Sequence, residues 1–227
     1  MYIAGLDECG KGSGFHVLLV CIATIEKDKH KSLTEIGVTD SKKLSPKRRK
    51  SIYNELLPII DDYGIGWSTA REIDTLGINE AHSLASKRAY KYLDITPDKL
   101  YVDGRERVDI EVPQETIIKG DLKIPIISAA SILGKVIRDE WICKIAKDYP
   151  SDYDLLNNKG YLTKKHRETL IKLGMGLYYS IIIGIHIIRI TSTVIILTNR
   201  DISWFLLWHQ YHWRFTTRFP FYTVTLS

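Results

Sequence analysis

Hydrophobic and polar positions along the first 174 residues alternate between short apolar runs of strand length and longer stretches with apolar residues at helical spacing. The longest apolar run covers residues 17–25 (VLLVCIATI), and its continuous, β-branched pattern is typical of a strand buried on both faces. Cys21 in this run is expected to be a small core residue. Shorter runs predict further strands at residues 2–4, 63–69, 99–103 and 114–119.

Helical spacing of apolar residues predicts helices between and after these strands. They begin at Ser45-Pro46, cover residues 78–93 and 127–149, and end with a helix that Thr163 caps and Gly174 terminates. The helix at 127–149 starts with small residues (SAAS), which permit a close approach to a neighbouring backbone. His82 is expected on a helix face or at the core edge rather than as a ligand. This alternation of strands and helices predicts an α/β layer structure.

Acidic residues stand at the ends of three predicted strands. Asp7 and Glu8 follow the first strand, Asp103 ends another, and Asp121 lies just past a third. Chemistry gathers at strand ends in α/β sheets, and hard divalent cations such as Mg²⁺ take oxygen ligands. Two such ions can stabilise the attacking and leaving oxygens of a phosphodiester displacement. The alternative is a set of ordinary turn acids, since Asp103-Gly104 is also a common turn pair.

A second motif overlaps the first pair of acids. Residues 5–12 (GLDECGKG) match a phosphate-binding loop at every position except the last, where Gly12 replaces a hydroxyl residue. That missing hydroxyl is the group that binds Mg²⁺ in such loops. Asp7 and Glu8 would also place negative charge against a polyphosphate. A nucleotide hydrolase is therefore a disfavoured alternative.

The charge balance limits how a nucleic-acid partner can be inferred. The chain of 227 residues carries a net charge of +5, but the last 53 residues hold four Arg and one acid, so residues 1–174 are only slightly basic. Binding to phosphates must therefore rest on local patches, such as residues 42–50, where six of nine residues are Lys or Arg. A solvated helix face is the competing interpretation of that run.

The cysteines and the N-terminus bear on the compartment. Three cysteines, with neither an even count nor zinc-ligand spacing, indicate free thiols. The N-terminus lacks the cationic start and apolar stretch of a signal peptide. Both features predict a cytoplasmic protein.

Six blocks, in order, give the chain from Ile3 to about Gly174 a resemblance to type 2 ribonuclease H (ribonuclease HII). They are GLDECGKG (5–12), TDSKKLS (39–45), YVDG (101–104), IIKGDLK (117–123), SAASILGKVIRD (128–139) and KGYLTKKH (159–166). The resemblance implies a ribonuclease H-like α/β fold, with a central mixed β-sheet flanked by helices. It also implies an endoribonuclease that cuts the RNA strand of RNA/DNA hybrids and single ribonucleotides in duplex DNA. Cleavage 5′ to a ribonucleotide would leave a 3′-hydroxyl and a 5′-phosphate.

The same resemblance assigns roles residue by residue. The family's catalytic, metal-binding carboxylates fall on Asp7, Glu8, Asp103 and Asp121, which would hold Mg²⁺ or Mn²⁺. Its loop that senses the ribonucleotide 2′-hydroxyl falls on Gly10, Lys11 and Gly12, its phosphate-contacting lysines on Lys42 and Lys43, and its sugar-packing tyrosine on Tyr161. A monomer without an obligate protein partner is expected. The rival hypothesis is a hybrid-binding protein without catalysis, although a pure binder has no need of four acids.

The chain departs from the family pattern at three places. Lys11 stands where the family usually has Arg, and Leu162 stands where it usually has Gly. Residues 13–17 (SGFHV) lack the proline and the second Gly-Pro pair that the family pattern has there.

Composition changes abruptly after Gly174. Residues 175–227 contain no Lys, one acid, four of the five Phe and three of the five Trp, which predicts a catalytic domain at 1–174 and an atypical hydrophobic, aromatic tail at 175–227. The uncharged run at 177–188 is short for a membrane span. A longer span with Arg189 near its middle would cost about 2.5–3.5 kcal/mol on insertion. A membrane anchor is thus disfavoured. An added packing element and a segment without an evolved role, such as one from a shifted reading frame, both stay open.

Overall fold

Five strands form one mixed sheet in the computed structural model, which describes residues 1–15, 17–173 and 179. The order across the sheet is β3-β2-β1-β4-β5. The strands are β1 (Tyr2–Cys9), β2 (Val17–Glu26), β3 (Asp62–Thr69), β4 (Lys99–Asp103) and β5 (Gln114–Ile117). All five predicted strands are confirmed, although β1 continues past residue 4 to Cys9 and β5 ends two residues early.

Strand direction divides this sheet into two parts. β2 runs antiparallel to both β1 and β3, whereas β4 runs parallel to β1 and β5 runs parallel to β4. The carboxyl ends of β1, β4 and β5 therefore lie at the same edge of the sheet. In α/β proteins this edge is where ligands bind.

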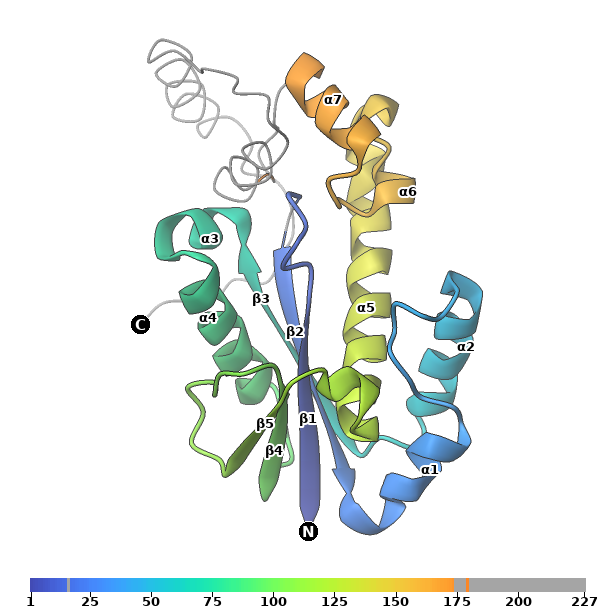
Figure 1. Ribbon diagram of the computed structural model, residues 1–227, viewed down its shortest axis with the longest axis vertical. Helices are drawn as coiled ribbons and strands as arrows, with labels where there is room; N and C mark the ends of the chain where they lie inside the picture. Colours follow the sequence, from blue (N-terminus) through green and yellow to red (C-terminus); the bar gives the residue numbers. More distant parts are fainter. Residues whose placement is uncertain (16, 174–178, 180–227) are drawn as a thin grey trace. The chain divides into compact units, whose positions relative to one another are not determined.

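Helices cover both faces of the sheet (Figure 1), as the predicted α/β layers require. α5 packs on β1 and β2 together with α1 and α2, and α4 packs on β2 and β3 from the other face with α3. The helices are α1 (His30–Glu35), α2 (Pro46–Leu56), α3 (Ala70–Leu76), α4 (Ile78–Lys91), α5 (Pro125–Ile145), α6 (Leu155–Asn158) and α7 (Lys164–Leu173).

Helix starts follow local sequence more closely than helix ends. Ser45 caps α2 through its side chain, which accepts from the Arg48 N–H, and Thr163 accepts from the His166 N–H at the start of α7. α5 begins at Pro125, two residues before the prediction, because proline suits the first turn of a helix. It ends four residues early, where the chain tightens into a 3₁₀ turn at Ala146–Asp148. The sequence pattern missed α1, α3 and α6, which are all short.

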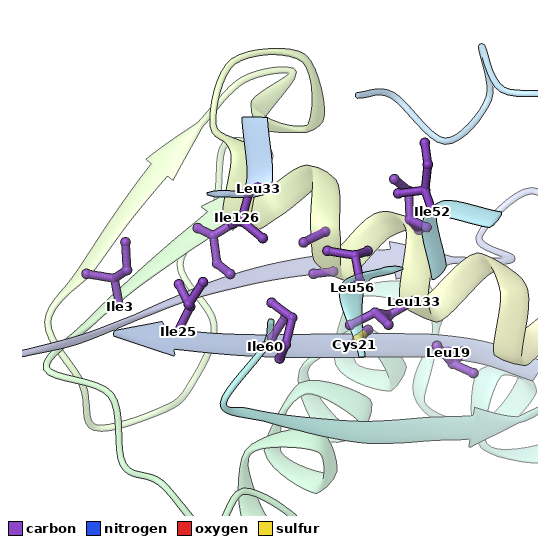
Figure 2. Packing of buried hydrophobic residues seen from close by; sticks show 14 residues of the cluster. Ile3, Leu19, Cys21, Ile25, Leu33, Ile52, Leu56, Ile60, Ile126 and Leu133 are labelled. Carbon is purple, nitrogen blue, oxygen red and sulfur yellow. The ribbon is translucent and has the colours of Figure 1, made fainter. Parts of the chain in front are cut away.

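The main core lies between the sheet and the layer formed by α1, α2 and α5 (Figure 2). Side chains from those helices and from β1 and β2 fill it, including Ile3, Leu19, Cys21, Ile25, Leu33, Ile52, Leu56, Ile126 and Leu133. α5 comes close to the sheet at Gly5 of β1, where an added Cβ would collide with the backbone of Ile126, two residues before the predicted small residues begin. This contact fixes α5 directly over the central strand.

Two other findings concern the predicted tail and the thiols. Apart from Tyr179, residues 175–227 lie outside the described part of the chain, and so do the predicted domain boundary and the membrane-anchor alternative. Among the described residues, no helix is long and apolar enough to cross a membrane. All three cysteines are free, and Cys21 is fully buried, as predicted.

Candidate active site

Strand register brings the first two acidic positions together. Leu6 of β1 pairs with Val102 of the parallel strand β4, so the next residues along, Asp7 and Asp103, stand side by side at the carboxyl end of both strands. Asp7 is 5% exposed, and its Oδ1 accepts a hydrogen bond from the Glu8 N–H at 2.8 Å. Asp7, Glu8 and Asp103 therefore form the start of one acidic edge.

Asp121 joins this edge through a turn rather than a strand. It lies in a 3₁₀ turn, Gly120–Leu122, that follows β5. The Gly120 N–H donates to Asp103 Oδ1 at 2.6 Å, which places the turn against β4, and Asp121 is 6% exposed. Asp7, Glu8, Asp103 and Asp121 together make up the acidic edge.

The charges on the acidic edge are poorly compensated. Burial raises the pKa of Asp7 to about 8, and the negative charges of Glu8 and Asp103 add to the rise, against a hydrogen bond from the Ser131 side chain that lowers it. Burial and the charge of Asp103 also raise the pKa of Asp121. These groups repel one another, so a bound cation would stabilise their ionised forms.

The donor set suits a hard divalent cation. All four side chains are carboxylates, and Mg²⁺ is usually held by one or two carboxylates while it keeps several waters. Within the described ranges, no three His, Cys, Asp or Glu side chains are grouped so that they could hold a metal ion in this arrangement. The four acids therefore supply oxygen donors of the kind that Mg²⁺ or Mn²⁺ takes, with the pKa of Asp7 and that of Asp121 raised, but they do not form a preformed cage.

Of the predicted phosphate-contacting lysines, one faces the acidic edge. Lys42 Nζ lies 4.0 Å from Asp121 Oδ2, and its side chain is 81% exposed. Lys43 is an exposed residue of the same turn, which Asp40 holds by accepting from both lysine N–H groups. Lys11, in the glycine loop, is also exposed and lies 3.6 Å from Glu8 Oε1. Lys42 and Lys11 thus place exposed positive charge beside the acids.

The two glycines of the predicted sensor loop differ in their surroundings. Gly10 has φ = +95°, and an added Cβ would collide with the Arg138 guanidinium and the Val17 carbonyl oxygen. At Gly12 an added Cβ would meet no atom within 4 Å. Gly10 therefore shapes the loop, whereas Gly12 leaves its backbone open to approach from outside.

Residues 13–15 support this loop without the family's proline. Ser13 donates its hydroxyl to the Gly160 carbonyl oxygen at 2.9 Å and accepts from the Phe15 N–H at 3.3 Å. Ser13 also forms an antiparallel bridge with Tyr161, and Phe15 is 1% exposed. A buried hydroxyl and a buried ring thus tie the glycine loop to the segment that carries Tyr161.

Tyr161 stands against two cationic residues of α5. Lys135 Nζ lies 4.7 Å from the ring centroid of Tyr161, and the Arg138 guanidinium carbon lies 5.1 Å from it. Arg138 is fully buried and also donates to the carbonyl oxygens of Val17 and Lys159. One side chain therefore contacts the glycine loop and the tyrosine segment together.

Sequence reasoning assigned no role to the polar face of α5. Ser131, Lys135, Arg138 and Asp139 recur at spacings of three and four along this helix, which is the signal that could have found them. Ser131 bonds to Asp7 and shares a 2.9 Å hydrogen bond with Ser41 Oγ. His82 of α4, expected at a helix face or core edge, lies there with Nε2 3.7 Å from Glu8 Oε2, and burial lowers its pKa.

Comparison with known proteins identifies the family. The sequence model described as Ribonuclease HII matches residues 4–178. The chain belongs to the ribonuclease HII family. A ribonuclease HII from Trichodesmium erythraeum is 44% identical over 174 residues, covering 76% of this chain and 82% of the relative. One from Acaryochloris marina is 42% identical and covers 76% of this chain and 87% of the relative.

Solved structures agree with this family and with the fold. The crystal structure of ribonuclease H2 from Pyrococcus horikoshii has a TM-score of 0.68 and 29% identity, and covers 85% of this chain and all of that one. The structure of a complex of PCNA and RNase HII from Archaeoglobus fulgidus has a TM-score of 0.67 at 24% identity, covers 80% of this chain and 94% of that one, and supports the fold alone. The ribonuclease H-like fold and a type 2 ribonuclease H enzyme are thus confirmed.

The phosphate-loop alternative is wrong. Residues 5–9 are extended strand, paired with β2 on one side, and the loop after them leads into another strand rather than into a helix. A phosphate-binding loop needs a helix N-terminus at that point, because the helix supplies the N–H groups that hold the anion.

Proposed function

We propose that this ribonuclease HII family member is a metal-dependent endoribonuclease that cuts the RNA strand of RNA/DNA hybrids and single ribonucleotides in duplex DNA. The observation that carries this proposal is the acidic edge, where burial, together with the charges of Glu8 and Asp103, raises the pKa of Asp7 to about 8. Asp7, Glu8, Asp103 and Asp121 would hold the cation. Mg²⁺ or Mn²⁺ bound there would polarise the phosphate and make water a better nucleophile.

The chain's own residues would orient the substrate and the acids. The Ser131 hydroxyl and the Gly120 N–H fix the carboxylates of Asp7 and Asp103, so their oxygens are positioned before the substrate arrives. Lys42 would contact a backbone phosphate beside the acidic edge, and Lys43 would contact one from the same turn. These contacts position the duplex and carry no sequence information.

Discrimination between RNA and DNA would come from the glycine loop and Tyr161. The open backbone at Gly12, with Gly10 and Lys11, would bond the ribonucleotide 2′-hydroxyl, which DNA lacks. The Tyr161 ring would pack on the sugar after the RNA-to-DNA junction. The water oxygen then bonds to phosphorus 5′ to the ribonucleotide while the bond from phosphorus to the preceding 3′ oxygen breaks. The products are a 3′-hydroxyl and a 5′-phosphate.

Single-turnover cleavage of a duplex with one ribonucleotide tests the proposal, with an all-DNA duplex of the same sequence as substrate control. We expect cleavage 5′ to the ribonucleotide in Mg²⁺ or Mn²⁺ and none in EDTA. Asp7→Asn should lower the rate by about 10³-fold or more, because it removes a charge that holds the cation. Asp109→Asn is the matched control, since Asp109 is an exposed acid paired with Lys87.

Two results would contradict this function. Cleavage by Asp7→Asn at the wild-type rate would remove the acidic edge from the chemistry. Tight binding of the hybrid without any cleavage by the wild-type chain in either metal would favour the hybrid-binding alternative.

A further inference from the structure

Tyr179 belongs to the compositionally foreign tail, yet it is built into the folded domain. It lies one residue past the family match, which ends at residue 178, and it is 4% exposed. Its ring centroid lies 4.9 Å from that of Phe15, 5.7 Å from that of His166 and 6.0 Å from that of Tyr153. Tyr179 also forms an antiparallel bridge with Phe15. The tail therefore contributes at least one core residue.

The hydroxyl of Tyr179 begins a chain of hydrogen bonds that ends at Tyr161. Tyr179 Oη lies 2.8 Å from His166 Nε2, and His166 Nδ1 lies 3.0 Å from the Tyr161 carbonyl oxygen. A carbonyl oxygen can only accept, so His166 Nδ1 carries a proton. Burial lowers the pKa of His166, which keeps the imidazole neutral, and Nε2 must then accept from the Tyr179 hydroxyl. The direction of both bonds is thereby fixed.

The same residue reaches the glycine loop by a second path. Phe15, its bridge partner, lies two residues from Ser13, whose hydroxyl bonds to the Gly160 carbonyl oxygen. Tyr179 thus contacts both segments that carry the proposed substrate-binding groups. His166 connects it to the Tyr161 segment, and Phe15 connects it to the segment that follows Gly12.

We propose that Tyr179 is a positioning residue for the substrate, acting through His166 to hold the backbone of Tyr161 beside the glycine loop. The effect on cleavage kinetics rests on the proposed function. The contact between Tyr179 and His166 rests on geometry alone. Tyr179 does not touch the acidic edge in this arrangement. Its loss should therefore weaken substrate binding more than it slows the chemical step.

A core aromatic residue without this role would act through its ring alone, so the informative variant is Tyr179→Phe. It keeps the packing with Phe15 and removes only the hydroxyl that donates to His166. Tyr153→Phe is the matched control, because it removes a hydroxyl from the same aromatic cluster and leaves the Tyr179, His166 and Tyr161 chain intact. Both are made in the full-length protein.

Steady-state cleavage of a duplex with one ribonucleotide separates the two roles. Tyr179→Phe should raise KM about 3- to 10-fold, the loss typical of one neutral hydrogen bond, and change kcat less than twofold. Tyr153→Phe should leave KM within about twofold of wild type. In a His166→Asn background, Tyr179→Phe should have no further effect, because the chain is already broken. Equal KM values for Tyr179→Phe and wild type would overturn the positioning role.

A spectroscopic measurement tests the contact independently of activity. Imidazole ¹⁵N spectra of the full-length protein at neutral pH should show His166 with its proton on Nδ1. Tyr179→Phe should shift the Nε2 resonance and keep the tautomer, whereas Tyr153→Phe should shift neither. A proton on Nε2 in the wild type would overturn the proposal. If wild type shows the expected spectrum but cleaves no substrate, the proposed function fails while the hydrogen-bond chain stands.

Discussion

The acidic edge includes the end of β1, and the loop support holds the glycine loop that follows β1, yet the two regions treat their polar groups in opposite ways. The loop support comprises Ser13, Phe15, Arg138, Gly160, Tyr161, His166 and Tyr179. In the loop support most buried polar groups have partners, and Arg138 Nη2 is an exception among the described residues. In the acidic edge, burial and neighbouring carboxylates raise the pKa of Asp7 and that of Asp121.

This difference indicates where free energy is stored for binding. A satisfied network rigidifies the loop that we propose recognises the substrate, at little electrostatic cost. Repelling carboxylates destabilise the metal-free fold, and a cation that binds only the folded state recovers that energy. Stability and function should therefore respond in opposite ways to substitutions in the two regions.

The largest expected effect is on stability at Asp7. Its folded-state pKa of about 8 lies above the ordinary value of 3.8, so the folded chain holds a proton that the unfolded chain releases. In EDTA, the destabilisation from Asp7 is absent below about pH 4, grows as pH rises, and is complete above about pH 8. Asp7→Asn should therefore raise the free energy of unfolding at pH 8.5 by on the order of 3 kcal/mol, and hardly change it at pH 4.

Urea unfolding in EDTA at both pH values measures this effect. Asp109→Asn serves as the control, since its exposed pair with Lys87 should contribute little at either pH. Saturating Mg²⁺ should stabilise wild type more than Asp7→Asn at pH 8.5. An Asp7→Asn protein less stable than wild type at pH 8.5 would mean that the ionised Asp7 side chain does not destabilise the metal-free fold.

Two glycines in one loop sharpen the comparison at the next level of effect. Gly10→Ala should lower the free energy of unfolding by about 2–4 kcal/mol, because φ is +95° there and the new Cβ would displace Arg138 and the Val17 carbonyl. Gly12→Ala should change stability by less than about 0.5 kcal/mol, since no atom lies near its Cβ position. Urea unfolding with and without EDTA gives both values.

Activity at Gly12 should not follow stability. If the backbone at Gly12 reads the 2′-hydroxyl, Gly12→Ala should reduce cleavage of the single-ribonucleotide duplex at least tenfold while the protein stays fully folded. Full activity of Gly12→Ala would move 2′-hydroxyl recognition to another part of the loop. Equal losses of stability in Gly10→Ala and Gly12→Ala would contradict the conclusion that Gly10 shapes the loop whereas Gly12 leaves its backbone open.

The sequence predicts the acidic edge better than the loop support for a physical reason. Strand periodicity is local, and parallel strands bring their ends to one edge, so Asp7 and Asp103 could be placed together from sequence. Asp121 was placed past a strand, which its 3₁₀ turn confirms. Ser13 and Gly160 are 147 residues apart and join through one hydroxyl, which no local pattern signals. The supporting role of residues 13–15 therefore emerged only in three dimensions.

The smallest expected effect separates the two lysines beside the acidic edge. Lys42 lies 4.0 Å from Asp121 Oδ2, and the pKa of Asp121, raised mainly by burial and Asp103, is held down in part by that charge. Lys42→Ala should therefore raise KM about 3- to 10-fold and make binding less salt-dependent than in wild type, because the proposed phosphate contact is gone. Lys43→Ala, made in the same exposed turn, should lose a similar phosphate contact without changing the titration of Asp121.

Salt-dependent binding to an uncleavable hybrid and carboxyl ¹³C titration of Asp121 measure the two effects. If both variants shift the titration of Asp121 equally, both lysine charges of the basic turn, rather than that of Lys42 alone, act on the Asp121 carboxylate.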